Sequence, residues 1–202
     1  IPLQRAASNI LGLEHVEIKP RIKNDFGNKC GMKDNYTVPG KYVTIATNST
    51  AGCKFWTREG WQKVINYLHG EGYMVINTSI ENNPFDNCEK IVDTSLEYTI
   101  DCIRQSEFFI GLSSGLSWLA WALDTPVIMI SNFTEENHEF ECTRVTKTDV
   151  CHGCWNDPQY TFDKGDWNWC PVHKGTDRQF ECHKSITSQD VIDVLPISST
   201  II

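Results

Sequence analysis

The sequence predicts an α/β fold in which helices cover a parallel β-sheet and a small metal finger follows. Two observations predict it. Between residues 41 and 131, short apolar and β-branched runs alternate with stretches whose apolar residues recur at helical spacing, which is typical of βαβ units. Beyond residue 132 this periodicity stops, and cysteines gather in the segment 142–182. The chain has 202 residues, enough for one ordinary domain and a small appendage.

Four buried strands are expected. Each is an apolar, β-branched run bounded by turns, at 42–46, 73–76, 108–111 and 127–130. A helix is expected after each of the first three. Thr57 and Ser95 can cap the first two helices, and the third follows the turn Ser113-Ser114-Gly115. A last helix is expected to begin near Thr187. Strand, helix and strand in alternation predict a parallel sheet with right-handed crossovers.

Composition excludes several classes of partner. The net charge is −8, which argues against nucleic acid because phosphate backbones are bound by clustered Lys and Arg. No apolar run reaches the roughly 18 residues that a membrane span needs. The sequence begins at Ile1 without an initiator Met or a signal peptide, so we expect a fragment or a processed product. Together with the clustered cysteines, these features predict a cytoplasmic protein.

Two loops of the expected sheet have the chemistry of a phosphate site. The first offers the hydroxyls of Ser49 and Thr50, a glycine and Lys54 just before a helix. The second, Ser113-Ser114-Gly115, joins a buried strand to a helix, whose N-terminal N–H groups are free to bind an anion. Ligands of open parallel sheets lie beyond the carboxyl ends of the strands, where both loops are expected. Either loop alone is also consistent with an ordinary turn, but two at one edge favour a diphosphate.

The strongest indication of a ligand is a group of four cysteines. They are Cys151, Cys154, Cys170 and Cys182. The first two form a C-x2-C pair, and four thiolates suit a tetrahedral metal site. The intervening chain has little core of its own, so metal binding is expected to drive its folding. Spacing alone favours zinc. A competing ligand set replaces Cys182 with His173, and Cys142 is a further candidate.

One pattern favours a different class, a secreted and disulfide-bonded glycoprotein. Four N-x-Ser/Thr sequons occur, at Asn35, Asn48, Asn77 and Asn132. In a chain rich in Asn, Ser and Thr such matches also arise by chance. The glycoprotein hypothesis predicts oxidised cysteines and no metal, so the state of the thiols distinguishes the two classes.

A longer match supports the diphosphate interpretation. The residues concerned are Ser49-Thr50, Lys54-Phe55-Trp56, Trp61 and the run 109–127, FIGLSSGLSWLAWALDTPV. With them, the stretch 42–134 resembles the C-terminal domain of the ADP-heptose glycosyltransferases, the heptosyltransferase family of the GT-B fold. The resemblance implies a Rossmann-like sheet and the donor-binding half of a glycosyltransferase.

The resemblance also implies roles for individual residues. The donor diphosphate would be contacted by Ser49, Thr50, Lys54, Ser114 and Gly115. Ser113 belongs to the same turn, and Glu81 would bind a ribose hydroxyl, although its position by itself favours an ordinary exposed loop glutamate. Two positions depart from the pattern. Lipopolysaccharide heptosyltransferases usually have Asp where Ser113 stands and His where Trp118 stands.

The cysteine segment resembles the four-cysteine finger of the bacterial autotransporter heptosyltransferases, which modify adhesins on Ser. This resemblance implies a structural iron rather than zinc, ADP-heptose as donor, an autotransporter as acceptor and a ring-shaped homo-oligomer. In that family the general base lies in an N-terminal domain, and no matching segment is present. We therefore expect this chain alone to bind the donor weakly without catalysing transfer.

The expected organisation has three parts. Residues 1–139 form the Rossmann-like nucleotide-sugar-binding domain, 140–184 the metal finger, and 185–202 a C-terminal helix and tail. An alternative function is a metal-stabilised, non-catalytic scaffold with a degenerate glycosyltransferase fold, which the departures at Ser113 and Trp118 favour.

Overall fold

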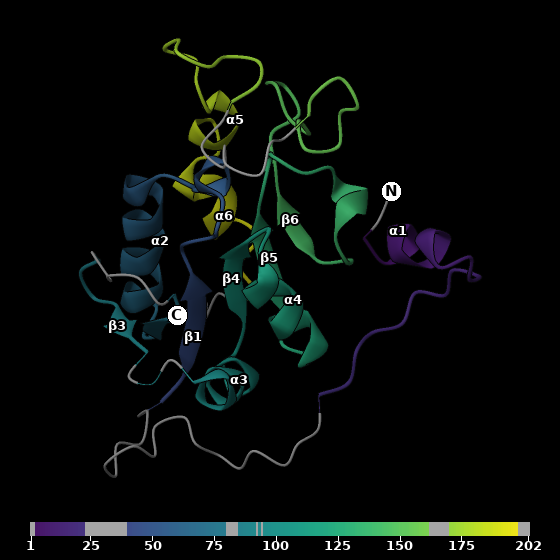
Figure 1. The fold of residues 1–202 in the computed structure, drawn as a ribbon. Helices are drawn as coiled ribbons and strands as arrows, with labels where there is room; N and C mark the ends of the chain where they lie inside the picture. Colours follow the sequence, from purple (N-terminus) through teal and green to yellow (C-terminus); the bar gives the residue numbers. More distant parts are fainter. Residues whose placement is uncertain are drawn as a thin grey trace.

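A computed structural model describes residues 3–22, 40–79, 85–91, 93, 95–161 and 170–197. Its centre is a six-stranded sheet in the order β3-β2-β1-β4-β5-β6, with every neighbouring pair parallel (Figure 1). The strands are β1 (Tyr42–Ala46), β2 (Met74–Asn77), β3 (Glu89–Lys90), β4 (Phe109–Leu112), β5 (Val127–Ile130) and β6 (Thr143–Val145). This is the strand order of the Rossmann fold, whose ligands bind where the order reverses, between β1 and β4.

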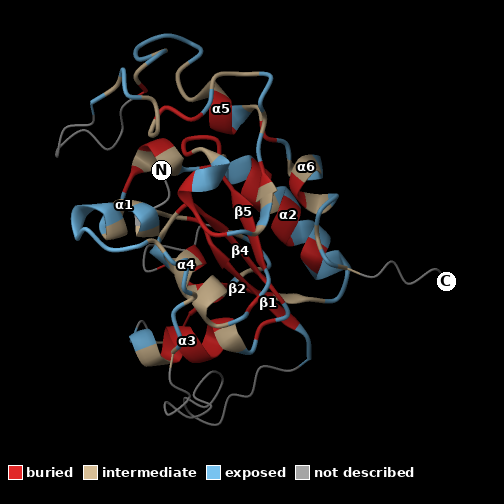
Figure 2. Ribbon diagram, turned by 90° about the vertical axis from the view of Figure 1, so that its right-hand side faces the viewer, coloured by how far each residue is buried: buried red, intermediate tan, exposed pale blue. Residues whose placement is uncertain are grey.

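Helices cover both faces of the sheet, and the buried strands lie between them (Figure 2). On one face are α2 (Arg58–Gly70) and α6 (Ser188–Ile192), and on the other α3 (Leu96–Arg104) and α4 (Gly115–Ala122). Outside these layers lie α1 (Leu3–Ile10), α5 (Glu181–Lys184) and the 3-10 turns η2 (Gly52–Lys54) and η3 (Glu136–His138).

The two faces bury separate apolar clusters. On the first face, Ile45 of β1 packs with Trp61 of α2 and Val191 of α6. On the second, Phe109 of β4 packs with Ile103 of α3 and Ala120 of α4. Neighbouring residues of a strand point to opposite faces, and both faces here are covered, so the central strands β4 and β5 are apolar along their whole length. The α/β fold with a Rossmann-like parallel sheet, predicted from the sequence, is confirmed.

The predicted helix starts are confirmed by their caps. The Thr57 hydroxyl accepts a hydrogen bond from the Gly60 N–H at 3.1 Å, and Ser95 accepts one from the Tyr98 N–H at 3.4 Å. Thr187 forms a capping box with Asp190 at the start of α6. Each cap satisfies N–H groups that have no partner inside the helix, and so fixes where the helix begins.

Two strands were not predicted from the sequence. β3 is two exposed residues long, and β6 runs beside β5, with Ile128 paired to Thr143 and Ile130 to Val145. β6 lies within the segment 140–184 that the sequence analysis assigned to the metal finger. Another unexpected feature is a disulfide bond at Cys102, on the buried side of α3.

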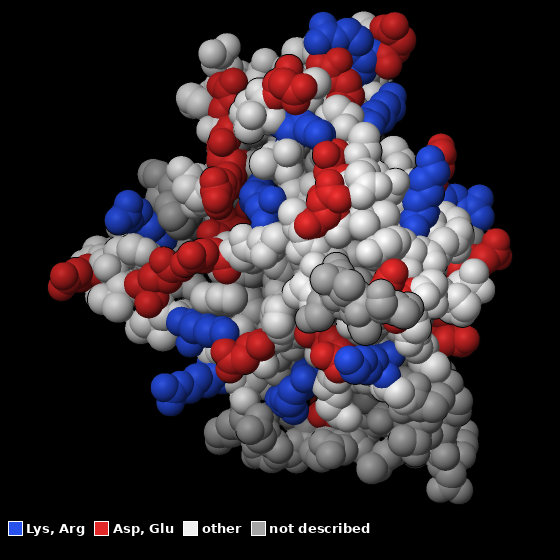
Figure 3. Space-filling view, turned by 180° about the vertical axis from the view of Figure 1, so that it is seen from behind, with Lys and Arg blue, Asp and Glu red and all other residues white. Residues whose placement is uncertain are grey.

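Charges of both signs are mixed on one face of the molecule. On the face shown in Figure 3, Lys and Arg side chains are scattered among Asp and Glu, so the described residues on this face form no continuous basic surface. With a net charge of −8, this distribution is unlike that of a nucleic-acid-binding face. Among the helices of the described residues, none is both long enough and apolar enough to cross a membrane.

Gly111 of β4 leads into the second candidate loop and has no room for a side chain. A Cβ there would lie 2.4 Å from the Phe109 ring and 2.8 Å from the Ser117 hydroxyl. Phe109 is fully buried and cannot move away. Gly111→Ala is therefore expected to lower the free energy of unfolding by about 1–3 kcal/mol in urea denaturation. Gly115→Ala is the matched control, since nothing lies within 4 Å of its Cβ. Equal stability of the two variants would contradict this packing.

Candidate functional site

The two predicted loops meet at the point where the strand order reverses. One follows β1 and the other follows β4, and these strands are hydrogen-bonded neighbours. Between the loops is a cavity of about 600 Å³. Its lining residues are Asn48, Ser49, Thr50, Lys54, Ser79, Leu96, Ser113, Ser114, Gly115, Leu116 and Leu119. The structure thus brings six of the seven predicted substrate-binding residues together, and the seventh, Glu81, lies outside the described residues.

The first loop is fixed at its base by Ser79, which follows β2. The Ser79 hydroxyl accepts hydrogen bonds from the backbone N–H of Thr47 at 3.0 Å and of Asn48 at 3.3 Å. Ser79 is buried and was not singled out from the sequence. Its position directly after a strand, at the same sheet edge as the other loops, was the available signal. The loop is therefore held open toward the cavity by a neighbouring strand rather than by its own turn alone.

Lys54 connects the two loops. It ends the 3-10 turn η2, and its Nζ donates a hydrogen bond to the Ser113 carbonyl oxygen at 3.0 Å. Burial lowers the pKa of Lys54, while the negative charge of Glu139 acts in the opposite direction. The ammonium group also lies 5.9 Å from the centre of the Trp155 ring, within range of a cation–π contact. A cation is thus held at the wall of the cavity between both loops.

The second loop presents the N-terminus of α4. Ser114 is the N-cap in extended conformation, but its side chain makes no capping hydrogen bond. Its hydroxyl is buried and has no hydrogen-bond partner among the described residues. Gly115, the first helical residue, is exposed. Backbone N–H groups in the first turn of a helix have no partner inside it, so this end can bind an anion.

Behind Ser113 lies a buried charged network that the sequence analysis did not find. The Ser113 hydroxyl donates a hydrogen bond to Glu139, and Glu139 forms an ion pair with Arg144. Thr134 donates to the same carboxylate at 2.9 Å and accepts from Arg144 at 2.9 Å. The side chains of Glu139 and Arg144 are only 1% and 7% exposed. The network therefore joins the wall of the cavity to the start of β6.

The four predicted metal ligands lie within electrostatic reach of one another. Cys154, Cys170 and Cys182 are buried, and Cys151 is half-buried. Burial, followed by the charges of the other three thiols, raises the pKa of Cys182 to about 12. Burial, a hydrogen bond to Glu181 and the charges of Cys154 and Cys170 raise the pKa of Cys151 to about 11. Buried thiols that oppose one another's ionisation fit a metal cation, which stabilises all the thiolates at once.

Of the competing ligands, His173 lies beside Cys151 and Cys142 lies elsewhere. Among the described residues, no three of the four cysteines have sulfur atoms that all lie within 4.8 Å of one another. Ligand atoms of Cys151, His173 and Glu181 all lie within 4.8 Å of one another. His173, however, contacts Glu181 at 3.2 Å, and Glu181 also accepts two hydrogen bonds from Arg178. Cys142 has Arg144, Glu139 and Glu136 as its charged neighbours. None of the finger cysteines is among them, which separates Cys142 from the four-thiol group.

The buried residue Asn132, in the loop after β5, ties the finger to the sheet. Its backbone oxygen accepts a hydrogen bond from the Gly153 N–H at 2.8 Å, within the C-x2-C pair. Its side-chain amide donates to the Cys182 oxygen at 2.7 Å. Cys154 also packs with Ala51 and Cys53 of the first loop. The finger is therefore built directly onto the loop that carries Lys54.

Two of the predicted sequons are closed to glycan attachment in this fold. Asn77 is 1% exposed and Asn132 is fully buried, and both amide groups donate hydrogen bonds inside the protein. In addition, all four finger cysteines are free thiols, whereas Cys102 is disulfide-bonded. The buried sequons weigh against the secreted glycoprotein hypothesis, while the Cys102 disulfide is a feature that this hypothesis predicts.

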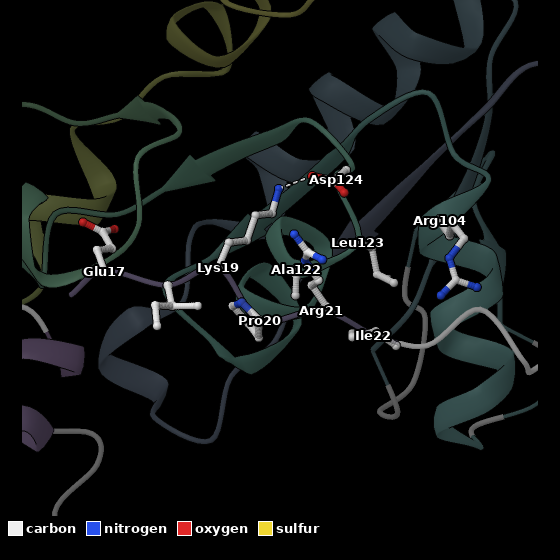
Figure 4. Close-up of a pocket in the computed structure, with 10 residues that line it drawn as sticks. Glu17, Lys19, Pro20, Arg21, Ile22, Arg104, Ala122, Leu123 and Asp124 are labelled. Carbon is white, nitrogen blue, oxygen red and sulfur yellow. Dashed lines mark hydrogen bonds and ion pairs between the residues drawn. The ribbon is translucent and has the colours of Figure 1, made fainter.

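A second cavity lies away from these loops. It has a volume of about 610 Å³ and lies between the segment 17–22 and helices α3 and α4 (Figure 4). Lys19 forms an ion pair with Asp124 across its edge, and Arg104 contributes from α3. None of the seven residues predicted to bind the substrate lines this cavity. The candidate donor site is therefore the cavity between the β1 and β4 loops.

Comparisons with known proteins identify the family of this chain. The family model of glycosyltransferase family 9 (heptosyltransferase) matches residues 3–166. Autotransporter heptosyltransferase Aah of Escherichia coli is 39% identical over 207 residues, which cover 96% of this chain and 51% of Aah. Inactive autotransporter heptosyltransferase BimC of Burkholderia thailandensis is 33% identical, with 93% and 45% covered.

A solved structure is similar over nearly the whole chain. The crystal structure of dodecameric iron-containing heptosyltransferase TibC, in complex with ADP-D-beta-D-heptose, superposes with a TM-score of 0.83 at 37% identity. The match covers 96% of this chain and 52% of the TibC chain. The chain thus spans about half the length of the curated relatives it matches. By its sequence and its fold, this chain belongs to glycosyltransferase family 9, the heptosyltransferases.

Proposed function

We propose that this chain is the donor-binding half of a protein O-glycosyltransferase, which transfers heptose from ADP-heptose to Ser residues of an autotransporter adhesin. The observation that carries the proposal is the meeting of Ser49, Thr50, Lys54 and the Ser113-Ser114-Gly115 turn in one cavity at the strand-order reversal. The similarity to Aah, and to TibC in complex with its ADP-heptose, supports this donor and this class of acceptor.

The chemistry follows from where charge develops. As the glycosidic bond breaks, negative charge builds on the departing nucleoside diphosphate. The Lys54 ammonium, the hydroxyls of Ser49 and Thr50, and the N–H groups at the start of α4 would stabilise that charge. Glu81, outside the described residues, is proposed to bind the ribose. The acceptor serine must lose a proton to a general base, which we place in the other half of the enzyme, so this chain alone should bind the donor without turnover.

We propose that the finger thiols of Cys151, Cys154, Cys170 and Cys182 hold a structural iron. The support is that their charges act on one another, that Cys154, Cys170 and Cys182 are buried, and that TibC is described as iron-containing. Bound there, the metal would cross-link four points of the chain and would serve structure rather than catalysis. Since TibC is dodecameric, we also propose that the complete protein forms a homo-oligomer. A bacterial cytoplasmic location is proposed on the clustered free thiols.

A second candidate function is a non-catalytic scaffold. Its support is that Ser113 and Trp118 replace residues usual in the lipopolysaccharide enzymes, and that the relative BimC is described as inactive. Trp118 packs edge-on against Phe140 at 5.0 Å and does not line the cavity. A scaffold would retain its metal and its fold but would not need to bind a nucleotide sugar.

The test is calorimetric titration of the metal-loaded chain with ADP-heptose, ADP and GDP-mannose. Binding of ADP-heptose and ADP, with GDP-mannose at least tenfold weaker (a difference of about 1.4 kcal/mol), is expected. A folded, metal-loaded chain that binds none of the three would favour the scaffold and remove the site assignments.

A further inference from the structure

The buried ion pair behind the donor cavity calls for an explanation beyond stability. Glu139 and Arg144 have side chains that are 1% and 7% exposed. The desolvation free energy of two buried charges offsets much of their mutual attraction. Apolar residues of similar size often stabilise a fold equally well. A buried pair is therefore weak support for the fold itself. The ion pair lies next to Ser113, which lines the cavity, so its effect is expected at the donor site.

Ser113 is the contact between this pair and the donor site. Its hydroxyl donates to the Glu139 carboxylate, and its carbonyl oxygen accepts from Lys54 Nζ at 3.0 Å. Ser113 is 4% exposed, so these two bonds fix both its side chain and its backbone. Ser113 is thus the residue that links the Glu139 carboxylate to the Lys54 ammonium group.

Both oxygens of the Glu139 carboxylate have partners that fix its orientation. Arg144 approaches one oxygen, while the Thr134 hydroxyl donates to the other at 2.9 Å. Arg144 in turn donates to the Thr134 backbone oxygen at 2.5 Å. Because each group has a partner, the carboxylate cannot rotate without breaking several buried hydrogen bonds. Its charge also acts on Lys54, opposing the effect of burial on the pKa of that ammonium group.

We propose that Glu139, oriented by Arg144, is a positioning residue of the donor site, which fixes Ser113 and thereby holds the Lys54 ammonium where the donor diphosphate binds. This inference rests on the proposed function. It assigns Glu139 no contact with the donor, because the carboxylate lies behind Ser113 and repels an anion. Its effect passes through Lys54.

The experiment is a double-mutant cycle on the full, metal-loaded chain, with ADP as the ligand. Glu139→Gln is expected to weaken ADP binding about tenfold, which is within the usual coupling of residues in one network. In the Lys54→Met background the same change should alter ADP affinity less than about twofold, since the group it positions is gone. Adenosine, which lacks phosphates, should bind wild type and Glu139→Gln equally. Glu141→Gln, which removes an exposed charge two residues away, is the matched control.

A second variant keeps the test decisive if Glu139→Gln folds poorly. Ser113→Ala leaves the ion pair in place but removes the hydroxyl that connects it to the loop, and it should weaken ADP binding to a similar degree. Wild-type affinity of Ser113→Ala, equal losses in both Lys54 backgrounds, or an equal loss for adenosine would each overturn the inference. If wild type does not bind ADP, the proposed function itself fails, and this inference falls with it.

Discussion

Cys154→Ala is expected to abolish stoichiometric metal binding and to unfold the finger. Cys154 is buried and belongs both to the four-thiol group and to the apolar cluster with Ala51 and Cys53. A structural metal held by four ligands contributes on the order of 10 kcal/mol to the folding of such a segment, far more than its few apolar contacts. Metal content per chain, measured by mass spectrometry, should fall from about one to near zero. The finger should then be cut by protease while the sheet resists.

Two controls separate this outcome from a general effect of losing a cysteine or a nearby ligand. Cys142→Ala should keep its metal, because the charged neighbours of Cys142 are Arg144 and nearby glutamates rather than finger thiols. His173→Ala should also keep it, because the imidazole pairs with Glu181. Loss of metal from His173→Ala with retention in Cys182→Ala would show that the alternative ligand set is correct. Full metal content in Cys154→Ala would contradict the four-cysteine site.

Lys54→Met is expected to weaken ADP binding by about 30- to 100-fold. Hydrogen bonds to charged groups contribute about 2–3 kcal/mol, and this ammonium is the cation that the structure places between both loops of the cavity. Isothermal titration calorimetry with ADP measures the change directly. Adenosine affinity should not change, because the lost interaction is with phosphate.

The matched control for Lys54 is Lys63→Met, on α2. Lys63 is 60% exposed at the side chain and pairs with Glu59 on the helix surface, so its removal should leave ADP affinity unaltered. A Lys54→Met chain that binds ADP as tightly as wild type would exclude the diphosphate role of Lys54. It would also favour the scaffold function.

Much of this architecture could be predicted from local sequence. Thr57, Ser95 and Thr187 are short polar residues just before apolar runs of helical spacing, and all three cap helices. The meeting of the two loops also followed from local patterns, because every parallel strand ends at the same edge. The strand order could not be predicted from local sequence patterns, because it depends on packing between distant segments.

The features that the sequence analysis did not predict share a property: each depends on contacts between residues far apart in the sequence. β3 and β6 are two and three residues long, too short for any periodicity. Glu139 lies in an aperiodic stretch and reaches Ser113 across 26 positions of sequence. A carboxylate in a loop is ordinarily solvated, and only tertiary structure reveals that this one is buried. The same limit applied to Ser79, whose role depends on lying beside the β1 loop.

The hydrogen bonds of Asn132 bear on whether the proposed finger could fold apart from this sheet. A segment that carried residues 151–182 into another protein would leave behind the amide that satisfies the Cys182 carbonyl and the carbonyl that satisfies the Gly153 N–H. Buried polar groups without partners destabilise a fold strongly, so the transplanted segment would bind metal in a strained frame. A graft of residues 151–182 alone is therefore expected to be less stable than one that also carries the loop with Asn132. The proposed finger is expected to depend on the sheet for two of its buried hydrogen bonds.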